Sequence, residues 1–150
     1  MPAVLARRWV TEEAVVECRE ALACPAARDE ALVLRRFVAV EGRARVRVQV
    51  ELARAYGTAR GTIAARDETG AWTLAAGAVR GHLLGAADAR VRDGRLELEL
   101  SLAEGGHHDL ALAVAHGRDP DVTDPTRAWS RGTRAGTARR RRALHHRSAS

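Results

Sequence analysis

The sequence predicts an all-β fold, an antiparallel β-sandwich of about eight or nine short strands followed by a disordered basic C-terminal tail. Three observations predict it. Several segments alternate apolar and polar residues, turn residues separate those segments at regular spacing, and no helical stripe of three or more turns occurs before residue 120. Clean alternation, in contrast to continuous apolar runs, favours antiparallel sheets with one solvated face.

The clearest alternation is the segment ARVRVQVELA, residues 44–53, in which valine and leucine alternate with arginine, glutamine and glutamate. The same pattern recurs in RLELELSLA, residues 95–103, and in DLALAVA, residues 109–115. Successive side chains of a strand point to opposite faces. Each segment therefore predicts a strand with one apolar face turned toward a core.

Turn residues bound these strands. The Asp-Gly pair at residues 93–94 predicts a tight hairpin turn, because both residues readily take the positive φ angles that such a turn requires. Gly105 and Gly106 predict the turn between the last two strands, and residues 67–70 predict a turn before a strand at 71–75.

Two further strands are expected upstream, AVVECRE at residues 14–20 and LVLRRFVAV at residues 32–40, separated by a loop that contains Pro25. The 150 residues include only three Trp, one Tyr and one Phe. The core must therefore be built mainly from Val, Leu and Ala. A single domain of this length buries roughly two thirds of its unfolded surface.

A change of composition after His116 divides the chain into a partial sandwich, residues 1–118, and an Arg-rich tail, residues 119–150. From Arg127 onward there are eight arginines and no acidic residue, whereas the preceding residues carry 17 arginines and all 19 acidic residues. The body is therefore close to −2, and the tail supplies the positive part of the net charge of +6. The tail has no apolar periodicity, which predicts disorder.

No metal site is expected. His107 and His108 are adjacent, and adjacent strand residues point to opposite faces, which is poor geometry for joint ligation. A zinc site also requires a third protein ligand held in place. The histidines of the body are predicted to be ordinary surface residues: His82, His107, His108 and His116.

The sequence provides no candidate catalytic residue and no candidate cofactor-binding residue. Glu97 and Glu99 lie on one strand face, whereas hydrolytic carboxylate pairs face each other across a cleft. Arg45 and Arg47 are interleaved with Glu51 and are expected to pair with charged residues across the sheet. No aromatic residue accompanies them for base stacking, which counts against an RNA-binding sheet. The chain has no nucleophile elbow, phosphate loop or dinucleotide fingerprint.

Trp9 and Trp72 allow two interpretations, a platform for stacking sugars or buried tryptophans of a sandwich core, and the second is the more frequent role. Cys18 and Cys24 are too few for a disulfide framework. The first ten residues lack the apolar region of a secretory signal, and no apolar run reaches the ~18 residues of a membrane span. These features predict a cytoplasmic protein with no membrane partner.

Read together, three segments resemble the N-terminal sandwich domain of bacterial glycoside hydrolase family 15 proteins, the glucoamylase-like and trehalase-like enzymes. The first is a Trp-x-Thr strand that leads into VVECREAL, and the second is the Arg35–Arg36 pair followed by VEGRARVRV. The third feature is that strand running out into Tyr56 and Gly57. The resemblance extends over residues 7 to 118.

The resemblance implies a role that is not catalytic by itself. In that family a helical α/α toroid follows the sandwich and holds the two glutamates that hydrolyse an α-glucoside with inversion. No part of this chain corresponds to the toroid, so no catalytic residue can be carried over. The chain resembles a sandwich shortened at both ends, and its implied partner is the toroid, in cis or as a separate chain.

Four further expectations concern the tail, the function of the chain and its surface. The end of both resemblance and periodicity near residue 120 suggests that the tail is translated out of an ancestral reading frame. Alternatively, the tail is an arm that binds nucleic acid or another polyanion without sequence specificity. The chain could also be a stand-alone carbohydrate-binding module. A sandwich without its partner is expected to self-associate through exposed apolar surface and open strand edges.

Overall fold

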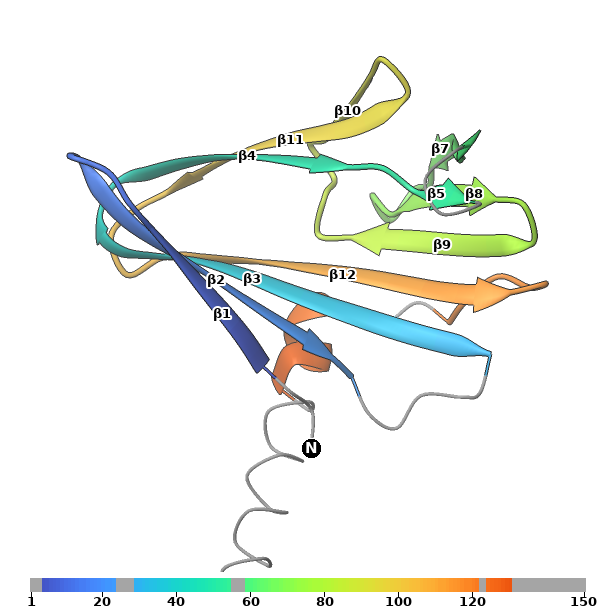
Figure 1. Ribbon diagram of the computed structural model, residues 1–150, viewed down its shortest axis with the longest axis horizontal. Helices are drawn as coiled ribbons and strands as arrows, with labels where there is room; N and C mark the ends of the chain where they lie inside the picture. Colours follow the sequence, from blue (N-terminus) through green and yellow to red (C-terminus); the bar gives the residue numbers. More distant parts are fainter. Residues whose placement is uncertain (1–3, 24–28, 55–58, 122–123, 131–150) are drawn as a thin grey trace, which may run out of the picture.

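The computed structural model describes residues 4–23, 29–54, 59–121 and 124–130 (Figure 1). These residues form a seven-stranded sheet, a three-stranded sheet and a two-stranded ribbon, and all strand pairs are antiparallel. The two larger sheets face each other across the core, which confirms the predicted all-β sandwich. Helix is confined, among the described residues, to 125–130.

The large sheet has β1 at one edge and β7 at the other. Strands far apart in the sequence are neighbours in this sheet, because β12 lies between β3 and β9. In spatial order the strands are β1 (Val4–Val10), β2 (Ala14–Leu22), β3 (Glu30–Gly42), β12 (His107–His116), β9 (Val79–Leu84), β8 (Trp72–Ala76) and β7 (Thr62–Arg66).

The small sheet contains the two most regular alternating segments. Its order is β10 (Arg90–Arg92), β11 (Arg95–Leu102) and β4 (Ala44–Val50). Asp93 and Gly94 connect β10 to β11 with φ angles of 49° and 75°, which confirms the predicted Asp-Gly hairpin. The short ribbon β5 (Ala53–Arg54) and β6 (Ala59–Arg60) continues the chain from β4 toward β7.

The core between the sheets is formed by the inward residues of both. Val48 and Leu98 lie opposite each other in the small sheet and are both buried, while Arg47 and Glu99 beside them are exposed. Phe37 is the aromatic residue among the buried members of this cluster, and the others, Cys18 apart, are Leu, Ala and Val. The expectation of a core poor in aromatic residues is therefore confirmed.

A second apolar layer covers the outer face of the large sheet. Leu34 and Ala111 are neighbours there, and the short helix at 125–130 packs Ala128 and Trp129 against the same cluster. Asp124 begins this helix as its N-cap, since its carboxylate accepts a hydrogen bond of 2.8 Å from the Arg127 N–H.

The disorder predicted for 119–150 is wrong for residues 124–130. Trp129 is only 5% exposed, because strands β3 and β12 carry apolar residues on both faces and the outer ones need cover. Residues 131–150, with the Arg-rich part of the tail, lie outside the described residues, so their expected disorder stays a prediction.

Candidate functional site

The histidines named from the sequence do not converge. His107 pairs with Val38 and His108 with Phe37, so the two rings leave opposite faces of β12 as expected. His108 Nε2 lies 2.6 Å from the Gly85 carbonyl oxygen. His82 and His116 lie elsewhere, on β9 and at the end of β12. Within the described ranges, no group of three His, Cys, Asp or Glu side chains is placed to hold a metal ion.

The charged residues of the small sheet pair across its solvent face. Arg47 donates to Glu99 at 3.1 Å, and Gln49 donates to Glu97 at 2.8 Å. These contacts confirm the predicted cross-strand pairing for Arg47. Arg45 lies opposite Ser101 instead and has no ion pair within the described part of the chain. Glu97 and Glu99 do not face each other across a cleft.

The two tryptophans have different environments. Trp72 on β8 is half-buried against the main core, and its indole N–H donates to the Ala86 carbonyl at 2.8 Å. Trp9 on the edge strand β1 is 48% exposed, so the core role expected for it is wrong. Four strands separate β1 from β8, a distance of roughly 24 Å along the sheet. The two rings therefore cannot form one stacking platform.

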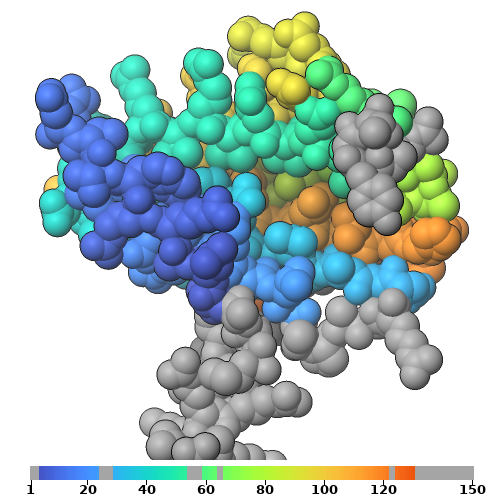
Figure 2. Space-filling model, in the orientation of Figure 1, coloured from blue at the N-terminus to red at the C-terminus, as the bar shows by residue number. Residues whose placement is uncertain are grey.

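A groove runs along the side of the sandwich where β1 and β2 extend past β4. Figure 2 shows this side, with β1 in dark blue below β4 in teal. Two adjoining cavities of about 680 and 420 Å³ make up the groove, and both are lined by Thr11, Val16 and Arg45. The groove exists because a three-stranded sheet is too narrow to cover a seven-stranded one.

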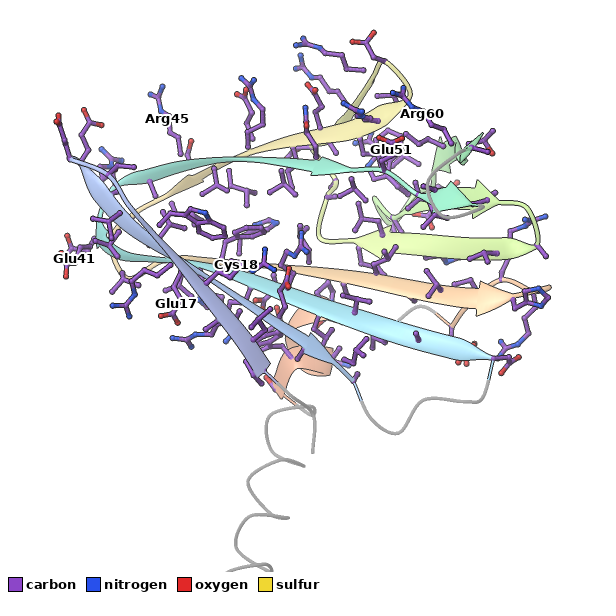
Figure 3. The ribbon with its side chains drawn as sticks, in the orientation of Figure 1. Glu17, Cys18, Glu41, Arg45, Glu51 and Arg60 are labelled. Carbon is purple, nitrogen blue, oxygen red and sulfur yellow. The ribbon has the colours of Figure 1, made fainter. Side chains whose placement is uncertain are left out.

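The floor of the groove is apolar. Trp9, Val16 and Phe37 line it together with Cys18, which has a free thiol and is 3% exposed. Burial raises the pKa of the Cys18 thiol above its usual value. Figure 3 shows Cys18 between the two sheets and Arg45 projecting from β4 toward solvent. Cys24 lies outside the described residues.

The rim of the groove is basic. Five arginines and two glutamates line the two cavities, which gives the groove a net charge of +3. Arg35 forms an ion pair with Glu20, and Arg47 forms one with Glu99. Among the residues that the structure places, Arg7, Arg43 and Arg45 form no ion pair, so their charges are available to a ligand or partner.

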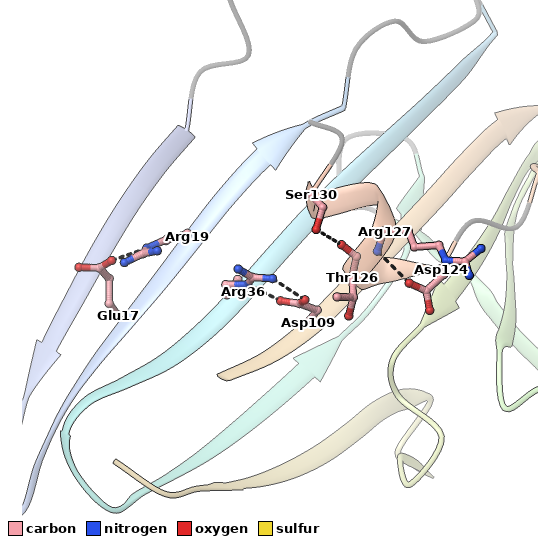
Figure 4. A network of polar contacts seen from close by, with 8 residues as sticks. All are labelled: Glu17, Arg19, Arg36, Asp109, Asp124, Thr126, Arg127 and Ser130. Carbon is pink, nitrogen blue, oxygen red and sulfur yellow. Dashed lines mark hydrogen bonds and ion pairs between the residues drawn. The ribbon is translucent and has the colours of Figure 1, made fainter. Parts of the chain in front are cut away.

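The opposite face of the large sheet contains a separate polar cluster (Figure 4). Arg36 donates two hydrogen bonds, of 2.6 and 2.7 Å, to the Asp109 carboxylate. The Trp129 ring lies 5.1 Å from the Arg36 guanidinium carbon, and the Thr126 side chain also hydrogen-bonds Asp109. Burial raises the pKa of Asp109, but the bonds from Arg36 and Thr126 outweigh it, and the pKa lies below its usual value.

This cluster is a structural clamp. The Asp109 side chain is 5% exposed and that of Arg36 is 19% exposed, and their charges are satisfied by each other. The cluster attaches the 125–130 helix to the sheet, and its two charged side chains are largely covered.

The sequence did not reveal the groove. Alternation assigned β4 one wet and one apolar face, but it gave no information on how many strands each sheet contains. A possible signal was Trp9, a large apolar residue between Arg8 and Val10 in a segment with no clear period of two.

The fold and groove define a β-sandwich protein with an open, basic-rimmed side. No family model, curated protein or solved structure matches the chain. The resemblance to the sandwich domain of glycoside hydrolase family 15 therefore stays a prediction. In the described parts of the chain, no helix has the length and apolar character that crossing a bilayer requires.

Proposed function

We propose that this chain is a non-catalytic sandwich module that works by docking against a helical domain which hydrolyses α-glucosides. The observation that supports docking most directly is the exposed apolar edge of the large sheet. Trp9 and Val10 on β1 are 48% and 73% exposed, and Val4 and Leu5 are about half exposed. Alternation along β1 places Leu5 and Trp9 on one face and Val4 and Val10 on the other, and exposed apolar side chains beside an open groove are typical of surfaces that bind another protein.

The nature of the partner comes from the resemblance. The Trp-x-Thr strand lies in β1 and the turn after it, and the VEGRARVRV segment forms the end of β3, the turn after it and the first residues of β4. Both segments border the groove, so part of the sequence that carries the resemblance also lines the candidate docking surface. The helical domain would belong to the same protein or to a separate chain, and the cytoplasmic location stays a prediction.

The test is complementation. The purified chain is assayed alone on trehalose and on a chromogenic α-glucoside, and then together with the helical catalytic domain of a family 15 enzyme expressed without its own sandwich. We expect no hydrolysis by the chain alone and a higher activity or thermal stability of the helical domain in its presence. Hydrolysis by the chain alone, or a helical domain that does not respond, would contradict the proposal.

A second function, polyanion binding, is favoured by one observation, the eight arginines without an acidic residue from Arg127 onward. The deletion that tests it must begin after Ser130, because Trp129 covers the large sheet. We expect binding to a single-stranded oligonucleotide to weaken steeply with salt and to disappear in the deleted protein. Unchanged binding in that protein would exclude the tail as the anion-binding segment.

A further inference from the structure

We propose that the free edge of β4 accepts an extended segment of a partner as an added strand, and that this segment alternates apolar with acidic residues. The inference rests on the proposed function in one respect, namely that the chain acts by docking. It goes further in that it names the edge that is used and the chemistry of the segment that binds there.

The first support is the edge itself. In the described part of the chain, β4 pairs with β11 on one side, and its other side faces the groove. Every second residue of Ala44–Val50 therefore directs its N–H and C=O groups away from β11. The seven residues of β4 span roughly 23 Å, and the three or four of them that point away from β11 are enough to pair with an added strand.

The second support is β11, which shows what β4 already accepts on its paired side. Leu98 lies inward opposite Val48, and Glu99 lies outward opposite Arg47. A strand with the same alternation on the free side would direct its apolar residues toward the groove floor. Its acidic residues would lie on the solvent face beside Arg45 and Arg47, as Glu99 lies beside Arg47 on the other side.

The third support is the unfilled floor. Trp9 and Val16 line the groove and are not fully covered, whereas Cys18 and Phe37 beside them are 3% and 5% exposed. Apolar side chains from an added strand would cover Trp9 and extend the core by one strand width, about 4.8 Å. The cavity of about 420 Å³ has room for such side chains.

The positive charge around the groove indicates which kind of segment can pair with this edge. Two copies of the chain that joined through β4 would bring Arg45 and Arg47 of one copy close to those of the other, and like charges across a strand pair are destabilising. The chain's own Arg-rich tail would be repelled in the same way. The net charge of +3 around the groove favours an acidic segment from a different protein or domain.

The test uses a fluorescein-labelled peptide that copies residues 96–102, LELELSL, with blocked ends, and the full chain as its receptor. We expect saturable binding by fluorescence anisotropy. Arg45→Glu should raise the Kd about tenfold, because one attractive cross-strand pair becomes repulsive. Arg90→Glu is the matched control, since it makes the same charge change on β10 at the far edge of the small sheet. We expect it to change the Kd less than twofold.

Two further peptides separate strand addition from simple attraction. A peptide with arginine in place of both glutamates should bind at least tenfold more weakly, and so should one with alternate backbone amides methylated, which cannot form the ladder. The proposal is overturned if no peptide binds, if the methylated peptide binds equally well, or if Arg90→Glu weakens binding as much as Arg45→Glu. Equal competition by an oligonucleotide would also overturn it.

The result is independent of the complementation assay. Peptide binding that depends on Arg45, combined with a helical catalytic domain that does not respond to the chain, would contradict the proposed function and leave the strand-acceptor edge in place. Complementation that is unchanged by Arg45→Glu, combined with no peptide binding, would support the proposed function and reject this edge.

Discussion

Arg36 and Asp109, which are 73 residues apart in the sequence, form a two-fold hydrogen-bonded ion pair directly across the β3–β12 ladder. The pair joins the central strands of the large sheet beneath the Trp129 ring. Because both side chains are largely removed from water, each depends on the other to satisfy its charge. The ion pair therefore has consequences for stability that can be measured.

Asp109→Asn should destabilise the fold strongly. The substitution removes the negative charge and leaves the Arg36 guanidinium, 19% exposed, without a counter-ion, and breaking a buried pair in this way costs about 3 kcal/mol. Urea unfolding followed by circular dichroism measures the loss. Glu99→Gln is the control, since it breaks a pair whose side chains are 65% and 77% exposed, and we expect a change near the experimental error. Equal losses in both variants would contradict the buried clamp.

Stability should fall as the pH drops through the acid range, and Asp109 should contribute to the fall. Its pKa is lower in the folded protein than the ordinary value of 3.8, so the unfolded state binds the proton more readily. The contribution of Asp109 is therefore complete well above pH 3.8 and is lost as the pH falls through and below that value. Urea unfolding at pH 6 and pH 3 measures the difference.

The control for this pH dependence is the Asp109→Asn protein, which cannot bind that proton. The carboxyl groups of Glu17, Asp29 and Asp67 also have lowered pKa values and remain in the variant. A smaller loss of stability between pH 6 and pH 3 in the variant is expected. An identical pH dependence in the two proteins would show that Asp109 does not titrate differently on folding.

Trp129→Ala should cost about 3 kcal/mol, because it removes the largest side chain of the outer apolar cluster and exposes Leu34 beneath it. Two truncations supply the comparison. A protein that ends at Ser130 should keep the stability of the full chain, whereas one that ends at Asp121 should lose as much as Trp129→Ala or more. If the shorter protein were as stable as the longer one, the 125–130 helix would not belong to the folded unit.

Gly42→Ala should destabilise the turn between β3 and β4 more than Gly105→Ala destabilises its own turn. Both glycines have positive φ angles, 68° and 74°, where a side chain costs about 1 kcal/mol. A Cβ atom on Gly42 would also lie 2.1 Å from the Glu13 carbonyl oxygen, whereas one on Gly105 would meet open space. Thermal unfolding of the two variants compares them. Equal losses would indicate that the β1–β2 turn moves away without cost.

Much of the local structure could be predicted from the sequence, and the small sheet shows why. The alternation in β4 and β11 defines which side chains face the core, and Asp93-Gly94 defines the hairpin, because both signals act between residues close in the chain. The pairing of Arg47 with an acidic residue across the sheet followed from the same alternation.

The open groove could not be predicted in this way. It depends on which strands pair, on the seven-to-three difference between the sheets and on the position of β1 at an edge. Those are contacts between segments far apart in the sequence, and a strand's own alternation carries no information about its neighbours. The exposure of Trp9 is one result of that arrangement.

The sequence by itself determined that this chain forms antiparallel strands, where most of them lie, which faces are wet and that the core is leucine, valine and alanine. Only the tertiary structure decided that Trp9 is exposed, that Trp129 is buried and that Arg36 meets Asp109. The physical reason is that side-chain alternation is a property of one strand, whereas burial is a property of the sheets that cover it.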